Sequence, residues 1–287
     1  MGLFNNYNKV GPGVSKNAPE KHRFFLFFEL FGRKFTKLVL LNLIYLAALI
    51  PLILGLRLSL TLNLDNIIKQ PLISFTGDII GIALLIIAGF ITGPATAGFT
   101  YVIRNFQREE HAWVWSDFKE HFKKNFKQGV AMTFIDYAAY FLLYVAFVFY
   151  IYGAGALAPS IAKASPYLSA VIVLLSIIYT WAHYYIYVMM VTFDLKLKDI
   201  IKNAIIFAFA KLPLNILISV ILIVLSFAML YYIAIGAILF IIFGFSLFGY
   251  IITFCVYPTI DKLMIKPQNH DDGDNGPGSD FSDELII

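Results

Sequence analysis

Residues 92–129 read TGPATAGFTYVIRNFQREEHAWVWSDFKEHFKKNFKQG, and the rest of the chain is organised around this stretch. It begins inside an apolar segment with Thr92-Gly93-Pro94, passes through a basic stretch rich in Phe, and re-enters an apolar segment at Gly129. Two apolar runs joined in this way are typical of neighbouring membrane spans with a polar connection between them. The rest of the chain repeats the pattern with variations.

The composition indicates a membrane protein. The chain has 287 residues, of which 60% are hydrophobic and 14% are charged, whereas a soluble domain is about half apolar and about a quarter charged. The single cysteine, Cys255, lies in an apolar run, which excludes an intrachain disulfide and a metal site built from cysteines. We expect no cofactor and no nucleic-acid partner. The lipid bilayer is the expected surrounding.

Six apolar segments are long enough to span a bilayer. They cover residues 38–56, 79–103, 130–152, 167–193, 212–230 and 233–257. Nineteen of the 22 Lys and Arg residues lie before the first segment, after the sixth, or in the second-to-third and fourth-to-fifth connections. The positive-inside rule therefore predicts that both termini are cytoplasmic. The fold class is an all-α membrane protein with six transmembrane helices, a kinked or broken second helix and cytoplasmic amphipathic helices.

The two ends of the chain differ from the spans. Residues 1–37 combine many Phe with Lys and Arg, which is typical of a cytoplasmic segment whose amphipathic helix lies in the headgroup layer. An early extension of the first span is the alternative. Residues 38–266 form the transmembrane domain. Residues 267–287 are acidic and rich in Gly, Asn and Ser, so we expect a disordered tail.

The Gly93-Pro94 pair predicts a break in the second span, because proline removes a backbone donor and clashes with the preceding turn. The hydroxyls of Thr92 and Thr96 could bond the backbone groups that are freed. One interpretation is a broken helix that lines a substrate site. The other is a packing kink, because Gly89, Gly93 and Ala97 form a row of small residues that allows close helix approach.

Residues 116–127 predict an amphipathic helix with Ser116 as N-cap. Phe118, Phe122 and Phe126 recur at intervals of four and form one apolar stripe. Trp113 and Trp115 precede it. Such a stripe can contact lipid or bind a partner, and we take Trp115, Phe118, Phe122 and Phe126 as candidate docking residues. A second candidate stripe is Leu195, Leu197, Ile200 and Ile201.

Two ionisable residues lie inside predicted spans. Asp136 lies roughly 10 Å beyond Gly129, and His183 roughly 16 Å before Asp194, at 1.5 Å per helical residue. Ionisable groups in a bilayer are costly, so they favour either a functional site or a structural hydrogen bond. We predict that both side chains face the protein interior near Thr92 and Thr96, and that these four residues form a polar site.

The sequence has no HExxH, GxSxG, P-loop or glycine-rich dinucleotide motif. We therefore expect no enzymatic activity.

Three stretches together resemble the YesL family of integral membrane proteins of Gram-positive bacteria. They are GPGVSKNAPEKHRFFLFFELFGRKFTKLVLLNL, the stretch of residues 92–129, and DLKLKDIIKNAIIFAFAKLPLN. The resemblance spans residues 1–266. Lys119 stands where an aromatic residue is expected, and the acidic tail is peculiar to this chain. The resemblance implies a multi-pass protein of the bacterial plasma membrane. It also implies an accessory role beside a sugar ABC transporter or a sensor kinase.

Two functional hypotheses follow. The first is a non-catalytic accessory or regulatory component of carbohydrate uptake or sensing, which binds its partner through the two apolar stripes. The second is a small-solute transporter, or a permease-like subunit, with its site at the broken second helix near Asp136 and His183. A polar, enclosed cavity at mid-membrane would favour the transporter.

Overall fold

A computed structural model describes residues 22–59, 71–153 and 159–265, and every regular element in these ranges is helical. Six helices are long and apolar enough to cross a membrane, which confirms the predicted fold class. They are α1 (Arg23–Ser59), α3 (Pro71–Gln107), α5 (Phe126–Val148) with η1 (Phe149–Gly153), α6 (Pro159–Met190), α8 (Leu212–Tyr231), and the run of α9 (Ile233–Leu239), η3 (Phe240–Gly244), α10 (Phe245–Ile260) and η4 (Asp261–Ile265). Two shorter helices, α4 (Val114–Lys124) and α7 (Leu197–Ala210), lie between spans.

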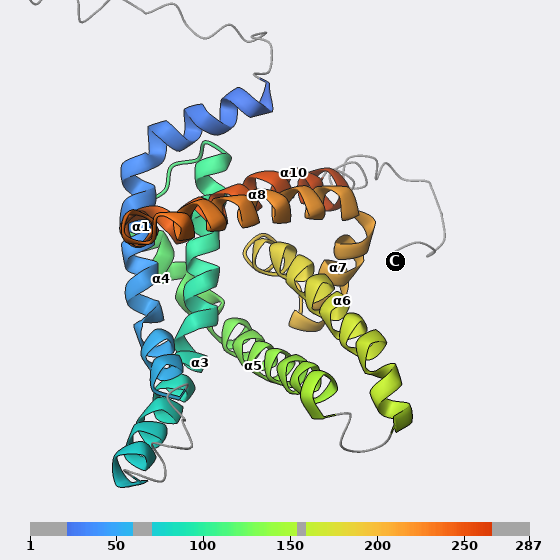
Figure 1. Cartoon of the computed structure of the whole chain (residues 1–287). Coiled ribbons are helices and arrows are strands. Elements are labelled where there is room, and N and C mark those ends of the chain that lie inside the picture. Colours follow the sequence, from blue (N-terminus) through green and yellow to red (C-terminus); the bar gives the residue numbers. More distant parts are fainter. Residues whose placement is uncertain (1–21, 60–70, 154–158, 266–287) are drawn as a thin grey trace, which may run out of the picture.

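The spans fall into three groups (Figure 1). Helices α1 and α3 run alongside each other on one side of the molecule, α5 and α6 slant away from them, and α8 lies beside α10 across the others. Helices α4 and α7 each come directly before a span, separated from it by Asn125 and Lys211 respectively. The chain therefore uses the same unit twice, an amphipathic helix followed by a span.

The Phe-rich N-terminal segment and the first predicted span form one continuous helix, α1, from Arg23 to Ser59. The placement of its first turns in the headgroup layer stays a prediction. Its first turns run at an angle to the remainder in Figure 1. The predicted irregular start of the chain and the acidic tail lie outside the described residues.

Helix α3 passes through Gly93-Pro94 without interruption, so the predicted break is wrong. A proline inside a long apolar helix is tolerated when packing supports the turn around it. Here α5 supplies the packing. A Cβ added at Gly93 would lie 1.9 Å from the Gly129 carbonyl oxygen, and one added at Gly129 would lie 2.5 Å from the Pro94 nitrogen. The two backbones touch, as the interpretation of this row as a packing site predicts.

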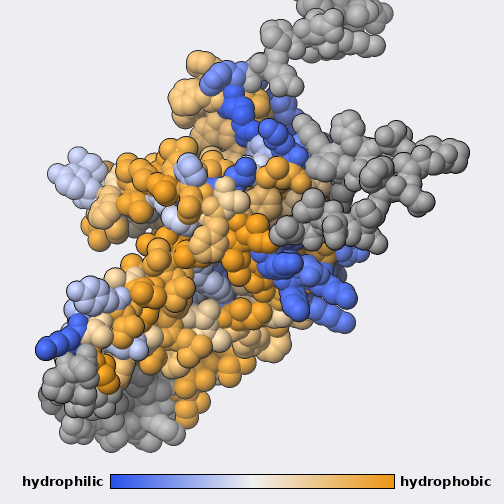
Figure 2. Space-filling model, turned by 90° about the vertical axis from the view of Figure 1, so that its right-hand side faces the viewer, coloured by the Kyte–Doolittle hydropathy of each residue, from blue (hydrophilic) through white to orange (hydrophobic). Residues whose placement is uncertain are grey.

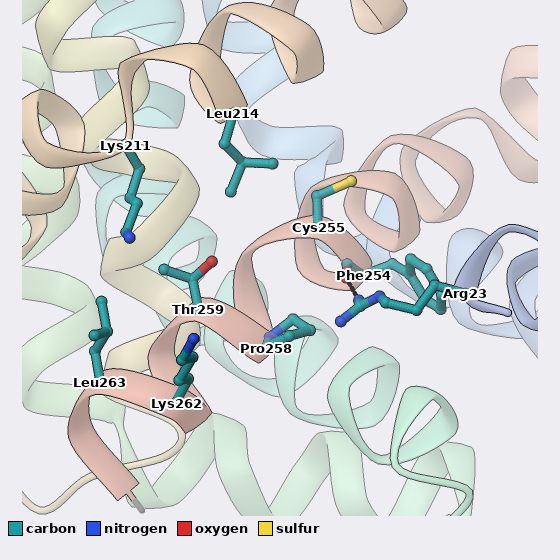
Figure 3. A pocket seen from close by; sticks show the side chains of 9 residues that line it. All are labelled: Arg23, Lys211, Leu214, Phe254, Cys255, Pro258, Thr259, Lys262 and Leu263. Atoms are coloured by element: carbon teal, nitrogen blue, oxygen red, sulfur yellow. Dashed lines mark hydrogen bonds between the residues drawn. The ribbon is translucent and has the colours of Figure 1, made fainter. Parts of the chain in front are cut away.

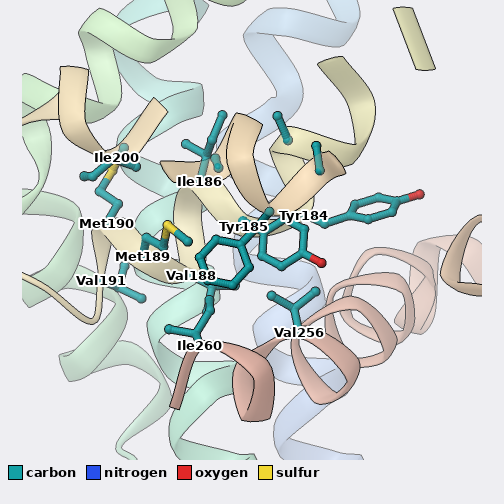
Figure 4. Close-up of a cluster of buried hydrophobic side chains, with 14 of the residues drawn as sticks. Tyr184, Tyr185, Ile186, Val188, Met189, Met190, Val191, Ile200, Val256 and Ile260 are labelled. Carbon is teal, nitrogen blue, oxygen red and sulfur yellow. The ribbon is translucent and has the colours of Figure 1, made fainter. Parts of the chain in front are cut away.

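The buried side chains form two clusters. One contains Leu38, Phe106 and Tyr250, where α1, α3 and α10 meet. The other, drawn in Figure 4, joins the end of α6 to α7 and α10 through residues such as Tyr185, Ile200 and Val256. Large apolar side chains elsewhere on the spans are exposed. Hydrophobic residues cover most of the face in Figure 2, as a lipid-facing surface requires.

The charged connections gather at one end of the spans. Arg33 of α1 pairs with Glu109 after α3 at 2.6 Å, and Lys37 donates to the Ala112 carbonyl at 3.2 Å. Gln128 at the start of α5 donates to the Leu195 carbonyl beyond α6 at 2.9 Å. We call this region the charged end. It contains the connections that the distribution of Lys and Arg assigns to a single side of the membrane.

Candidate functional site

Asp136 and His183 meet between α5 and α6. The Nε2 atom of His183 lies 2.8 Å from Oδ1 of Asp136, and the Tyr179 hydroxyl donates to the same oxygen at 2.6 Å. The histidine contact is short, but Nε2 lacks the geometry of a hydrogen bond to Asp136, so we treat it as a close polar contact. The side chains of His183 and Asp136 are 18% and 16% exposed. They are largely enclosed by protein, which agrees with the predicted inward orientation.

Thr92 and Thr96 belong to a neighbouring cluster. The Thr96 hydroxyl donates to the Thr92 carbonyl at 2.8 Å and lies 2.8 Å from the Tyr45 hydroxyl of α1. The Thr92 hydroxyl is buried without a partner among the described residues. Thr133, one turn before Asp136, packs against Gly93. The structure thus brings Asp136 and His183 into contact and places the two threonines across the α3–α5 crossing from them.

Part of the predicted docking stripe on α4 is buried. The helix begins at Val114 rather than after Ser116, and Asp117 accepts a bond of 2.9 Å from the Trp113 N–H. Phe118 is 6% exposed, and its backbone lies against Gly98 of α3. Phe122 packs against the same core. Phe118 therefore holds α4 on the spans and is not available to a partner, and Phe122 is partly covered beside it. Trp115 and Phe126 remain exposed.

The second predicted stripe is also internal. Ile200 of α7 is fully buried, and Leu195, Leu197 and Ile201 pack against the cluster around it. A stripe of apolar residues on a polar helix needs a surface to cover it. For α7 the structure supplies that surface from α6 and α10, so this docking prediction is wrong.

A basic depression lies at the charged end. It consists of two adjoining cavities of about 610 and 620 Å³ that share five lining residues: His121, Lys124, Val191, Thr192 and Phe193. The first cavity also has Lys123, Lys127 and Asp194 in its lining, and the second has Arg104, Arg108, Glu120 and Asp261. Five Lys and Arg side chains thus face three carboxylates. The depression carries a net positive charge and suits an anionic partner.

Arg104 and His121 form the inner wall of the basic depression. Arg104 is 7% exposed and donates to the Val191 carbonyl at 2.6 Å and to the Thr192 hydroxyl at 3.2 Å. Its Nε atom is buried without a partner among the described residues. The same holds for Nδ1 of His121, whose ring stacks on Tyr101 with centroids 3.3 Å apart. Buried polar atoms without a partner are uncommon in folded proteins, and they often mark a place where a bound molecule completes the hydrogen bonds.

The His121 imidazole is neutral at pH 7. Burial, together with the nearby charges of Lys124 and Arg104, lowers the pKa of His121 to about 4. A neutral ring at this position adds no charge to the depression. Its Nδ1 atom can still donate or accept one hydrogen bond.

Sequence reasoning missed three buried polar residues. In the sequence, Arg104 is one of several cations in a basic connection. In the structure, its guanidinium donates to the Val191 carbonyl at the end of α6. Asn42 donates to the Ile241 carbonyl at 2.7 Å and accepts from the Ser246 N–H at 3.0 Å, which supports the π-helical turn η3. Asn215 accepts from the Tyr185 hydroxyl at 2.7 Å. The available signal was a strongly polar side chain within or beside an apolar run.

One comparison with known proteins found a match. The family model described as "Protein of unknown function, DUF624" matches residues 71–147, which comprise α3, α4 and nearly all of α5. Neither the curated proteins nor the solved structures gave a match. The matched region contains the stretch of residues 92–129, the crossing at Gly93 and Gly129, and Arg104 and His121 of the basic depression.

Proposed function

We propose that this protein is a non-catalytic accessory component of the bacterial plasma membrane that binds an acidic segment of a partner in its basic depression. The observation that carries the proposal is the pairing of net positive charge with two buried unpartnered polar atoms, Arg104 Nε and His121 Nδ1. A partner that fills the depression would supply acceptors to Arg104 and carboxylates to Lys124 and Arg108.

The accessory role and its setting rest on the resemblance to the YesL family. That resemblance favours a sugar ABC transporter or a sensor kinase as the partner and a Gram-positive plasma membrane as the location. The distribution of Lys and Arg favours cytoplasmic termini. The depression is suited to such a role because the walls come from several elements, namely α3, α4, the α6–α7 connection and α10 with η4. A binding surface built on packed helices holds its shape better than one on a loop.

Affinity purification from the native membrane tests the proposal. Lys124→Glu reverses a charge inside the depression, and Lys119→Glu makes the same change on an exposed position of α4 outside its lining. We expect a transporter subunit or sensor kinase to co-purify with the wild type and with Lys119→Glu, and to be lost with Lys124→Glu. Recovery of the same proteins with both variants would contradict the proposal.

Transport of a small solute is the second candidate, and the Asp136–His183 pair favours it. A carboxylate and an imidazole 2.8 Å apart within the spans could exchange a proton during transport. Neither Asp136 nor His183 lines the basic depression, and the accessory role rests on the charges gathered there. Asp136→Asn should stop solute flux in vesicles if this candidate is right, whereas Glu120→Gln should leave it intact.

A further inference from the structure

A separate cavity lies where α1 begins, α7 meets α8, and α10 ends. Its volume is about 380 Å³, near the lower limit of small-ligand pockets, which is roughly 300 Å³. Three cationic residues from distant parts of the chain, Arg23, Lys211 and Lys262, contribute to its lining. Figure 3 shows Lys211 and Lys262 reaching towards each other across the cavity, while Arg23 enters from the other side beside Phe254.

The remaining lining is mostly apolar. It consists of Leu214, Phe254, Cys255, Pro258, Thr259 and Leu263, so the lining contains no carboxylate. This composition differs from that of the basic depression, where acidic side chains balance part of the charge. Three cations beside an apolar wall suit a ligand that is anionic at one end and hydrophobic at the other.

Arg23 is held in position for such a ligand. Its guanidinium donates to the Phe254 carbonyl at 2.7 Å and lies over the Phe254 ring at 5.0 Å from the centroid. A guanidinium has five N–H donors, so one bond to a carbonyl leaves others to bind a phosphate. The backbone of Lys211 is held in place because this residue is both the C-cap of α7 and the N-cap of α8.

The apolar side of the cavity continues along α8. Leu217 follows Leu214 by three residues, so both lie on one face of the helix. Leu217 is exposed, as are Ile216 and Val220 around it. An acyl chain could therefore extend from the cavity along the lipid-facing surface of α8 while the phosphate stays near the three cations.

We propose that this cavity binds the headgroup of an anionic phospholipid. Basic pockets between transmembrane helices recognise lipid phosphates through such clusters of Lys and Arg. The apolar wall favours a lipid over free phosphate, because a small inorganic anion would leave that wall uncovered. The site stands apart from the basic depression, and the inference does not depend on the accessory role.

Native mass spectrometry of the purified full chain tests the site. The protein is titrated with phosphatidylglycerol, which is anionic, and with phosphatidylcholine, which is neutral overall. We expect phosphatidylglycerol to bind at least tenfold more tightly. The double variant Lys211→Gln/Lys262→Gln should weaken phosphatidylglycerol binding about 10- to 30-fold, in line with the contribution of two lysines near a charged lipid surface, and leave phosphatidylcholine binding unchanged.

The matched control is Lys198→Gln/Lys202→Gln, which removes two exposed charges of α7 outside the lining. It should retain the affinity of the wild type. The thermal unfolding midpoint of each variant, measured without added lipid, checks that the fold is intact, and Lys262→Gln alone serves if the double variant is unstable.

Three results would overturn the proposal. The two lipids could bind equally well, or the lining and control variants could lose affinity equally. Alternatively, millimolar inorganic phosphate could displace phosphatidylglycerol completely, which would identify a site for free anions.

Discussion

At the scale of single residues, Arg104 joins the end of α3 to the end of α6. Its side chain extends from the end of α3 to the carbonyl that follows α6 and forms part of the basic depression. The last carbonyls of a helix lack intrahelical donors, and a cation there also interacts favourably with the helix dipole. The same side chain therefore stabilises the fold and contributes positive charge to the basic depression.

Replacing Arg104 by Gln should lower the stability of the fold. A buried hydrogen bond to a charged group contributes about 1.5–3 kcal/mol, and the Val191 carbonyl would lose its donor. We expect a decrease of several degrees in the thermal unfolding midpoint in detergent. Arg108→Gln, at a half-exposed position in the same depression, should shift the midpoint far less. Equal shifts for both variants would contradict the role given to Arg104.

His121 should make stability depend on pH. The folded state holds its pKa near 4, below the ordinary value of 6.5, so between these values the unfolded chain binds a proton that the folded chain does not. The contribution of His121 to the free energy of unfolding is therefore fully present above about pH 6.5 and is lost as the pH falls towards 4. His121→Phe keeps a ring on Tyr101 and removes the titration. Thermal unfolding at pH 7.5 and pH 5 should therefore show a smaller acid loss for the variant than for the wild type.

At the scale of elements, the sequence predicts that another helix packs closely on α3, but it does not predict which helix or at which residue. Gly89, Gly93 and Ala97 predicted close packing, and α5 supplies the close neighbour at Gly129. The break predicted at Pro94 did not occur, because local propensity is overridden when a neighbouring helix supports the turn. The Phe stripe of α4 was recognised correctly as apolar. Periodicity alone could not say whether lipid, a partner or the protein itself covers it.

A methyl group at the crossing should separate the two helices. Gly93→Ala places a Cβ against the Gly129 carbonyl, and overpacking of this kind costs typically 1–3 kcal/mol. Gly32→Ala is the control, because nothing lies within 4 Å of the added atom and alanine favours helix. Detergent unfolding should show a lower midpoint for Gly93→Ala and no loss for Gly32→Ala. A Gly93→Ala variant as stable as the wild type would contradict the contact.

At the scale of the whole molecule, the six spans and the clustering of their charges could be predicted from composition and from the placement of Lys and Arg. The polar contacts could not. Asp136 and His183 lie 47 positions apart in the sequence, and only the packing of α5 on α6 brings them to 2.8 Å. The basic depression likewise forms only because α4 and the α6–α7 connection both lie near the ends of α3 and α10. Pairings of this kind arise from tertiary structure and leave no local pattern.

We propose that the charged end of all six spans faces the cytoplasm. Accessibility of single cysteines to a membrane-impermeant thiol reagent tests it in intact cells, in a Cys255→Ser background. Lys123→Cys changes a residue of α4 at the charged end, and Tyr231→Cys changes the last residue of α8, at the opposite end of the fifth span. We expect labelling at position 231 and protection at position 123 until the cells are opened. Labelling at position 123 in intact cells would contradict it.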